Sequence, residues 1–383
     1  MTALRVPVAP AVLEWAQERA GQSNGGAAVK FKSWPKWISG SLQPTLRQVE
    51  QIATWAHVPF GALFLPEPLP VELPVADFRV GPGGPAHRPS QELLDSLQTS
   101  QRRQNWFHDY ATRVGLEPVA LVGSARDQTP EQAAQWARAT LGFEVSQRQK
   151  LTRDDVRNLV RDRFENLGGI AIFAGIVGNN THRPLDNEEF RGFSLSDDYA
   201  PLIFVNAKDS KGAQLFTFFH ELGHILRRES GVSEWSLTDA PPNDAERWCN
   251  AFAAEVLVPA ADLRAHTSSG EITTETLDAL SKRYNASTLT ILVRMRSLAL
   301  IPRNGFDDRY QAERDRIMRI VDEAPARSGG NHWNNQKFRI SARFARAIIA
   351  DTYEGGTSYT DALRLLGFSS ATMLDTYAEK LGV

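Results

Sequence analysis

Two histidines four residues apart place the strongest constraint on this chain. Residues 216–226 read FTFFHELGHIL, in which His220 and His224 are separated by three residues. Residues i and i+4 of a helix lie on one face about one turn apart, so two imidazole nitrogens can reach one ion at about 2.0–2.1 Å. The flanking residues are mostly apolar, which predicts a buried helix, and a buried His–Glu–His turn with nothing to bind would carry a desolvation cost. We therefore expect a metal centre, with Zn²⁺ as the metal.

The residue between these histidines predicts a chemical role for the site. Glu221 lies one step around the helix from His220, so its carboxylate is placed to contact a water molecule on the metal instead of the metal itself. Such a carboxylate acts as a general base and can return the proton to a leaving amine. Glu229 follows His224 by five residues and is expected to lie off the metal-binding face.

A catalytic zinc site has three protein ligands and one open position, so one more ligand must come from elsewhere in the chain. Glu246 is the favoured candidate, because it opens a predicted helix and its neighbours at i+4 and i+7 are Asn250 and Ala253, which are small or polar. On spacing alone, Asp244 and Glu255 stay open as alternatives.

Composition limits the possible partners and location of the protein. The 383-residue chain is long enough for two or three domains, and its formal net charge is −2. This charge predicts no overall attraction to nucleic acid or to an anionic membrane. The single cysteine, Cys249, excludes a disulfide within the chain and a multi-cysteine zinc site, and it fits a reducing compartment. No apolar stretch approaches the ~20 residues of a membrane span, and the N-terminal residues lack a signal-peptide pattern, so we expect a cytoplasmic protein.

The first predicted region, residues 1–78, combines short helices with a proline-rich segment. Helical patterns cover 12–20 and 45–56, and the second of these begins with Thr45 and a glutamine three positions later, which is a capping-box pattern. Residues 59–74 contain five prolines, which predicts an extended linker.

The second predicted region, residues 79–302, carries the metal motif. It opens with a helical lead-in at 88–165, and residues 169–206 then read as a small sheet of about three strands. Further helices are predicted at 214–228, 244–256, 275–284 and 287–298. Residues 303–383 form a third region that is helical by pattern. The predicted fold class is α+β and mainly helical, with a small β-sheet in the core and helical domains on either side.

The motif and its surroundings resemble a known family. The HELGH sequence, the E-x-x-C-N-x-F-A-A-E-x-L-x-P pattern from Glu246 to Pro259, and the preceding PLIFVN segment resemble the ImmA/IrrE family of metallopeptidases over about residues 165–300. The resemblance implies a zincin-like core, in which the glutamate that opens the second helix is the third zinc ligand, here Glu246. The arrangement is also similar to thermolysin-like enzymes, which implies that Asn250 contacts His220 on the side of the ring away from the metal and holds it in position.

The N-terminal region resembles a second family. WAQERAGQS, the W-x-x-G of Trp37–Gly40, and QPTLRQVEQIA resemble the helix-turn-helix domain of the XRE type, which is often fused ahead of ImmA/IrrE peptidases. The chain departs from that pattern, because the segment between Ser23 and Trp37 is shorter by about one helical turn, roughly four residues. Pro35 also lies where the recognition helix would run, and proline breaks a helix interior. We therefore expect no sequence-specific DNA binding and favour a role in protein docking.

The substrate-binding groups are less well defined by the sequence. A peptide substrate is often held in extended form along an exposed strand edge, and we expect Phe190–Ser196 to be that edge. Tyr199, His266 and Tyr284 are candidates to stabilise the carbonyl oxygen of the substrate, and nothing in the sequence selects among them.

Together these features predict a zinc-dependent endopeptidase that cleaves one partner protein. The family resemblance implies that this protein substrate is a transcriptional repressor encoded nearby. The alternative is a DNA-binding regulator or antitoxin-like scaffold in which the zinc is structural. Glu221 favours the enzyme, because a structural site has no use for a general base and would close its fourth position with a side chain.

Overall fold

The computed structural model describes residues 4–20, 26–56, 58–68, 75–77, 89–233, 243–267, 272–302, 304–323 and 332–383. The chain divides into two compact units. The first comprises Met1–Pro74 and His87–Asp95, and the second comprises Val75–Ala86 and Ser96–Val383. Among the described residues, no helix is long and apolar enough to cross a membrane.

The first unit is a cluster of short helices around an apolar core. Its helices are α1 (Pro10–Arg19), α2 (Gly26–Lys30), α3 (Trp34–Ile38), α4 (Leu46–Ala56) and the 3₁₀ helix η1 (Phe60–Phe64). The predicted helices at 12–20 and 45–56 are confirmed. The Thr45 backbone N–H donates to Gln48 Oε1 at 2.8 Å, and the Gln48 N–H donates back to Thr45 Oγ1 at 3.3 Å, which is the predicted capping box.

Two expectations for this unit were wrong because each misjudged the position of a proline. Pro35 lies in the first turn of α3, where its missing N–H has no helical partner to lose, so it does not interrupt the helix. The helix is nevertheless only five residues long. Pro59 immediately precedes η1, so residues 60–64 are helical instead of extended. Residues 69–74 of the predicted linker lie outside the described residues.

The second unit is built on a five-stranded mixed sheet. Its strands are β1 (Ala76–Asp77), β2 (Ile170–Ala174), β3 (Gly192–Leu195), β4 (Leu202–Asn206) and β5 (Gly231–Ser233), and their order across the sheet is β1-β5-β3-β4-β2. β2 and β4 are parallel, β3 is antiparallel to both β4 and β5, and β1 is parallel to β5. The three predicted strands are present, and the mainly helical α+β class is confirmed. The two shortest strands, β1 and β5, were not predicted.

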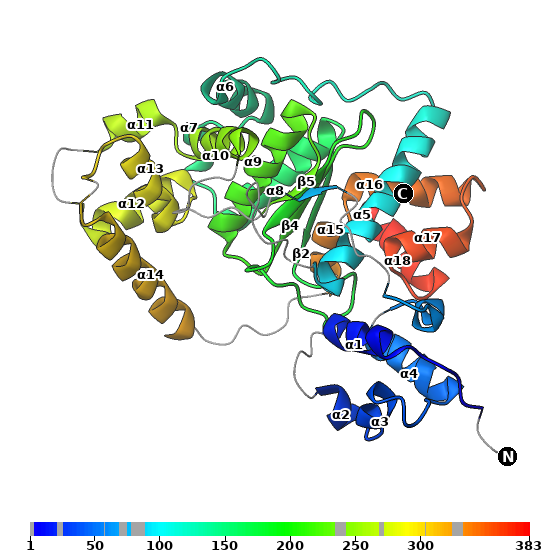
Figure 1. Ribbon diagram of the computed structural model, residues 1–383. Helices are drawn as coiled ribbons and strands as arrows, with labels where there is room; N and C mark the ends of the chain where they lie inside the picture. The colour runs from blue at the N-terminus through cyan, green and yellow to red at the C-terminus, as the bar shows by residue number, and fades with distance from the viewer. Residues whose placement is uncertain are drawn as a thin grey trace. The chain divides into compact units, whose positions relative to one another are not determined.

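Helices cover this sheet in successive layers. α9 (Lys211–Arg227) packs on β3 and β4, α10 (Asp244–Leu257) packs on α9, and α6 (Pro130–Leu141) packs on α10 (Figure 1). α8 (Arg153–Asn166) lies against α9 and β2. The aromatic rings of Phe218 and Phe219 on α9 are fully buried in this core. The remaining helices before residue 300 are α5 (Gln91–Arg113), α7 (Val145–Arg148), α11 (Ala260–Ala265), α12 (Thr274–Tyr284) and α13 (Thr288–Ser297).

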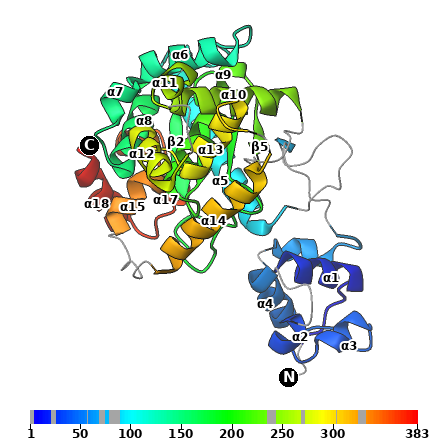
Figure 2. The same cartoon turned by 90° about the vertical axis from the view of Figure 1, so that its left-hand side faces the viewer.

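The C-terminal part of the second unit is helical, as predicted. It contains α14 (Phe306–Glu323; Figure 2), α15 (His332–Arg339), α16 (Ala342–Tyr353), α17 (Tyr359–Leu366) and α18 (Ala371–Leu381), of which the last three pack on one another (Figure 1). This group is joined to the rest of the unit by specific polar contacts. Arg103 Nε donates to the Leu365 carbonyl at 2.9 Å, and the Arg343 N–H donates to Glu165 Oε2 at 3.1 Å.

Candidate metal centre

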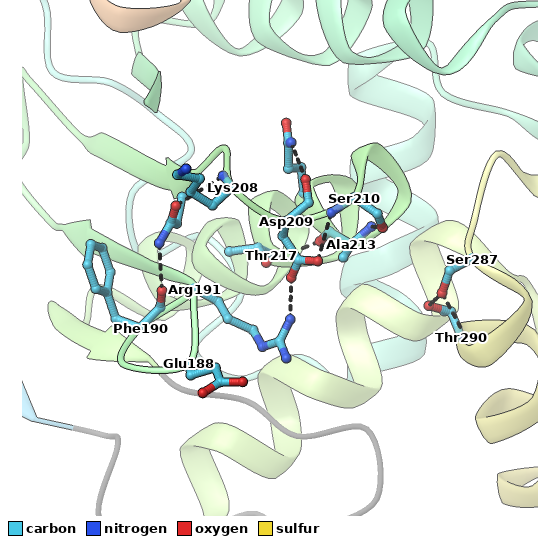
Figure 3. A network of polar contacts seen from close by, with 12 residues as sticks. Glu188, Phe190, Arg191, Lys208, Asp209, Ser210, Ala213, Thr217, Ser287 and Thr290 are labelled. Atoms are coloured by element: carbon cyan, nitrogen blue, oxygen red, sulfur yellow. Dashed lines mark hydrogen bonds and ion pairs between the residues drawn. The ribbon is translucent and has the colours of Figure 1, made fainter. Parts of the chain in front are cut away.

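The N-terminal end of α9 is fixed to the strands beneath it. Ser210 caps the helix by accepting from the Ala213 N–H. Asp209, immediately before the cap, forms an ion pair with Arg191, which immediately precedes β3 (Figure 3). The chain therefore holds the start of the motif helix and the start of β3 together, and this fixes the position of the HELGH turn over β3.

Three of the predicted site residues converge at one point between α9 and α10. His220 Nε2 lies 3.0 Å from Glu246 Oε2, His224 Nε2 lies 3.0 Å from Glu246 Oε1, and the two Nε2 atoms lie 3.2 Å apart. Among the described residues, these three form a group of ligand atoms close enough to hold one metal ion. Glu246 reaches this point because it lies in the first turn of α10, which Asn243 caps by accepting from the Glu246 N–H at 2.8 Å.

The donor set fits a zinc ion. Ligand atoms at 2.0–2.1 Å from a tetrahedral zinc lie about 3.3 Å from one another, close to the three separations in this site. Two imidazole Nε2 atoms face each other and a carboxylate, and Glu246 Oε1 does not meet hydrogen-bond geometry with any described residue. Burying several acceptor atoms at one point raises the free energy of the folded state unless a cation compensates their partial negative charge.

The outer nitrogens of both histidines have partners. Asn250 Oδ1 lies 2.9 Å from His220 Nδ1, which is the contact that the resemblance implies for this asparagine. Glu229 Oε2 lies 3.3 Å from His224 Nδ1. Partners of this kind fix the ring orientation and the tautomer of a ligand histidine, so that Nε2 stays free for the metal.

Sequence reasoning missed the contact made by Glu229. The spacing correctly excluded this residue from the metal face, but the chain turns back directly after α9. Arg228 adopts a left-handed conformation with φ of 62°, and the Glu229 N–H then donates to the His224 carbonyl at 2.9 Å. Left-handed C-caps favour glycine or asparagine, so the arginine at this position does not predict that the chain turns back after α9.

Glu221 is fully buried beside the candidate metal ligands and lies against β3. A Cβ atom added to Gly192 of β3 would lie 3.0 Å from Glu221 Oε1 and 2.6 Å from Thr217 Cγ2. Neither carboxylate oxygen of Glu221 meets strict hydrogen-bond geometry with a described residue, but the buried Ser194 hydroxyl on the same face of β3 is close enough to act to lower the pKa of Glu221. Burial raises the pKa of Glu221 to about 7, although His220 and His224 act to lower it.

The electrostatics separate the roles of the two glutamates. Burial acts to raise the pKa of Glu246, but His220 and His224 outweigh it and hold this pKa at about 2. Glu246 is therefore a permanent anion at neutral pH, as a metal ligand must be. Glu221, with a pKa near neutrality, is suited to exchanging a proton.

Close approach of α9 and α10 depends on Gly223, the fourth residue of the HELGH motif. A Cβ atom at this position would lie 3.0 Å from Cys249 Sγ and 3.2 Å from Phe252 Cδ1. Cys249 is a buried free thiol that packs between the helices, and it is not in the metal-ligand group.

The other acidic candidates are engaged elsewhere. The Asp244 side chain is largely exposed and forms an ion pair with Arg247. Glu255 pairs with Arg294 and accepts from the Ala260 N–H. Neither belongs to the group that surrounds the metal position.

The structure also shows where the three candidates for binding the carbonyl oxygen lie. The Tyr284 hydroxyl donates to Asp262 Oδ1 at 2.6 Å, and His266 Nδ1 lies 3.5 Å from the same carboxylate. The ring of Tyr199 packs edge-on against His108. None of these contacts links the three residues to the candidate metal ligands, so the structure does not select among them.

The prediction that Phe190–Ser196 forms an exposed strand edge was wrong. β3, which lies within this segment, has β4 on one side and β5 on the other. The error arose because β5 is only three residues long and follows directly after the motif helix, so it had no pattern of its own in the sequence.

Comparison with protein families agrees with the site. The family model described as an IrrE N-terminal-like domain, of peptidase family M78, matches residues 179–296, which contain all three candidate ligands and Glu221. A family model of unknown function matches residues 340–380, the segment of α16 to α18. A search of curated proteins finds no match for this chain. The match over residues 179–296 supports a peptidase.

Proposed function

We propose that the protein is a zinc-dependent endopeptidase with a zincin-like core. His220, His224 and Glu246 hold the metal, and Glu221 is the general base. The observation that carries the proposal is the buried convergence of three side chains, whose facing nitrogen and oxygen atoms lie about 3 Å apart, beside a carboxylate that is not part of the ligand set. The peptidase family match over the same residues supports it.

In the proposed hydrolysis, different residues of the chain have different roles. Zn²⁺ bound at these ligands would act as a Lewis acid, which makes a water molecule more acidic and polarises a peptide carbonyl. The Glu221 carboxylate accepts a proton from the attacking water and delivers it to the leaving amine nitrogen. Asn250 and Glu229 hold the two imidazole rings in the orientation that leaves Nε2 toward the metal. The buried surroundings strengthen each of these electrostatic interactions.

A structural zinc site in a DNA-binding regulator or antitoxin-like scaffold is the competing function. A structural site closes its fourth position with a protein ligand, and the ligand group among the described residues has three members. Glu221 would also have no task in such a site, while its burial beside the metal position would still cost free energy. We therefore favour the enzyme.

The substrate that we propose is a single partner protein, for instance a transcriptional repressor encoded nearby. A peptidase that acts in the cytoplasm must not digest proteins generally, so docking regions outside the active site must contribute to selectivity. The first unit and the helices after residue 303 are available for docking. We propose that the first unit has a helix-turn-helix-like origin but does not read DNA sequence, because α3 has only five residues.

The experiment is a search for new N-termini. The zinc-loaded protein and its Glu221→Gln variant are incubated with proteins encoded nearby and with a whole-cell extract, and the products are identified by mass spectrometry. We expect the wild type to produce one cut in one partner, and the variant to produce none while it retains zinc. Identical products from both proteins would refute the enzyme, and broad digestion of unfolded proteins would refute the dedicated substrate.

A further inference from the structure

We propose that β5 occupies, within the chain itself, the strand position that an extended protein substrate takes beside Glu221. The structure is then a closed form, and β5 must leave β3 before a substrate strand can bind. This inference rests on the proposed function, because it concerns the regulation of the same site.

β3 lies directly against the general base. Gly192 lies directly against the Glu221 carboxylate, and the absence of a side chain at Gly192 allows this approach. Side chains alternate along a strand, so Ser194 lies on the same face as Gly192, toward α9. A substrate whose scissile bond is to meet Glu221 must run close to these residues, and β3 is the part of the sheet that offers backbone groups there.

β5 already uses the backbone edge that such a substrate needs. It pairs antiparallel with β3, with Gly192 opposite Ser233, Phe193 opposite Val232, and Ser194 opposite Gly231. The other edge of β3 is paired with β4. A strand can pair with two neighbours only, so a substrate strand can add to β3 only after one of these neighbours has left.

The metal centre is closed to solvent in this arrangement. His220, Glu221 and His224 are each 0% exposed, and Glu246 is 1% exposed. A hydrolase that acts on a polypeptide must admit a chain several ångströms wide to its general base. The observed form therefore cannot bind its substrate without a change in the segments that cover the site.

β5 is the neighbour that can leave most easily. All five residues of β4 pair with β2 and four of them also pair with β3, and β4 lies beneath α9. β5 has three residues, and among the described residues its outer edge pairs with the two-residue strand β1 alone. Val232 is its one large apolar side chain. Elements with few backbone bonds and little buried apolar surface open locally at lower free energy than the core.

A fixed point lies just before β5. Glu229 contacts His224, and Ser230 Oγ accepts from the Ser196 N–H at 2.7 Å. Residues 231–233 can therefore separate from β3 while Glu229 keeps its contact with His224. β1, whose residues Ala76 and Asp77 pair with Gly231 and Val232, adds a second strand that must part from β5 in the same step.

The first test measures opening without any substrate. Hydrogen–deuterium exchange of the full zinc-loaded chain should show the amides of residues 231–233 exchanging at least 100-fold faster than those of residues 203–205 in β4. Equal protection of the two segments would overturn the proposal, because β5 would then be as firmly held as the core of the sheet.

The second test locks the strand. Phe193→Cys combined with Val232→Cys places two thiols on residues that lie directly opposite each other in β3 and β5, where the Cα atoms of an antiparallel pair are close enough for a disulfide; the native Cys249 is buried between α9 and α10. The oxidised double variant should transfer zinc to the chelator dipicolinate at least 10-fold more slowly than its own reduced form. Each single variant, treated with the same oxidant, controls for nonspecific oxidation. Equal zinc-transfer rates in the oxidised and reduced forms would refute the proposal.

A cleavage assay with the disulfide-locked variant tests whether β5 blocks the substrate. The oxidised lock should abolish the cut in the partner found by mass spectrometry, and reduction should restore it. Continued cleavage by the oxidised form would show that β5 does not block the substrate. If neither wild type nor reduced variant cuts any protein, the proposed function fails, while the exchange and zinc-transfer results still decide whether β5 opens.

Discussion

Gly223→Ala tests whether the metal site depends on the close approach of α9 and α10. The added Cβ would lie 3.0 Å from Cys249 Sγ and 3.2 Å from Phe252 Cδ1, distances at which the neighbours must move. Overpacking of this kind costs about 1–3 kcal/mol, and replacing a helical glycine with alanine returns about 1 kcal/mol. We expect a net loss of about 0–2 kcal/mol in the free energy of unfolding of the metal-free protein.

The effect on zinc should be larger than the effect on folding. The metal-free variant can relieve the overlap by moving α10 outward, but zinc binding requires Glu246 to return to within about 3 Å of both histidines. If 1–2 kcal/mol of strain reappears on binding, the dissociation constant for zinc rises about 5–30-fold. Competition with a fluorescent zinc chelator measures this constant, and thermal unfolding of the metal-free form measures stability.

Two further variants make this test decisive. Gly175→Ala is the matched control, because its added Cβ meets neighbours only at 3.5 Å, an ordinary contact distance, and it should leave zinc affinity unchanged. Cys249→Ala removes the closest obstacle, so the double variant with Gly223→Ala should recover at least half of the lost binding free energy. Unchanged zinc affinity in Gly223→Ala, or no recovery in the double variant, would refute the reasoning.

Other predictions follow from the same contacts. Glu246→Ala should abolish stoichiometric zinc binding, as measured by metal analysis after gel filtration, whereas Asp244→Ala should not; the reverse result would show that the third ligand is wrong. Asn250→Ala and Glu229→Ala should each weaken zinc binding by about 10–100-fold in the same competition assay, and unchanged affinity would remove their positioning role. Cys249 should react with iodoacetamide far more slowly in the native protein than in urea, because burial raises the pKa of its thiol; equal rates would contradict its packing. The full chain should bind duplex DNA weakly and lose that binding steeply with salt, and salt-tolerant selection of one operator in a gel-shift assay would favour the regulator.

The sequence was most informative where short-range spacing determines structure. The four-residue spacing of His220 and His224 depends only on helix geometry, and the structure places both imidazoles at one point. Glu246 is predicted as the third ligand by the small and polar residues on its face of the helix and by the family resemblance, and the structure brings its carboxylate to the same point. These features require no knowledge of how distant strands pair.

The features that the sequence did not reveal depend on tertiary contacts. β5 is a Gly–Val–Ser segment whose strand conformation exists only because β3 pairs with it. β1, with two residues, is a strand only through β5. The contact of Glu229 with His224 requires a left-handed arginine, a conformation that local propensity disfavours. We propose that these same contacts close the site, so sequence patterns predict the chemistry but not the route by which a substrate reaches it.

The most direct test of the central claim measures zinc content and peptide-bond hydrolysis together in the Glu221→Gln variant. Glu221 is buried beside the three candidate ligands but is not part of their group. The variant should therefore bind one zinc per chain, as the wild type does, and should release no product from a partner protein that the wild type cleaves. Loss of zinc from the variant would show that Glu221 is a ligand, and undiminished cleavage would show that it is not the base.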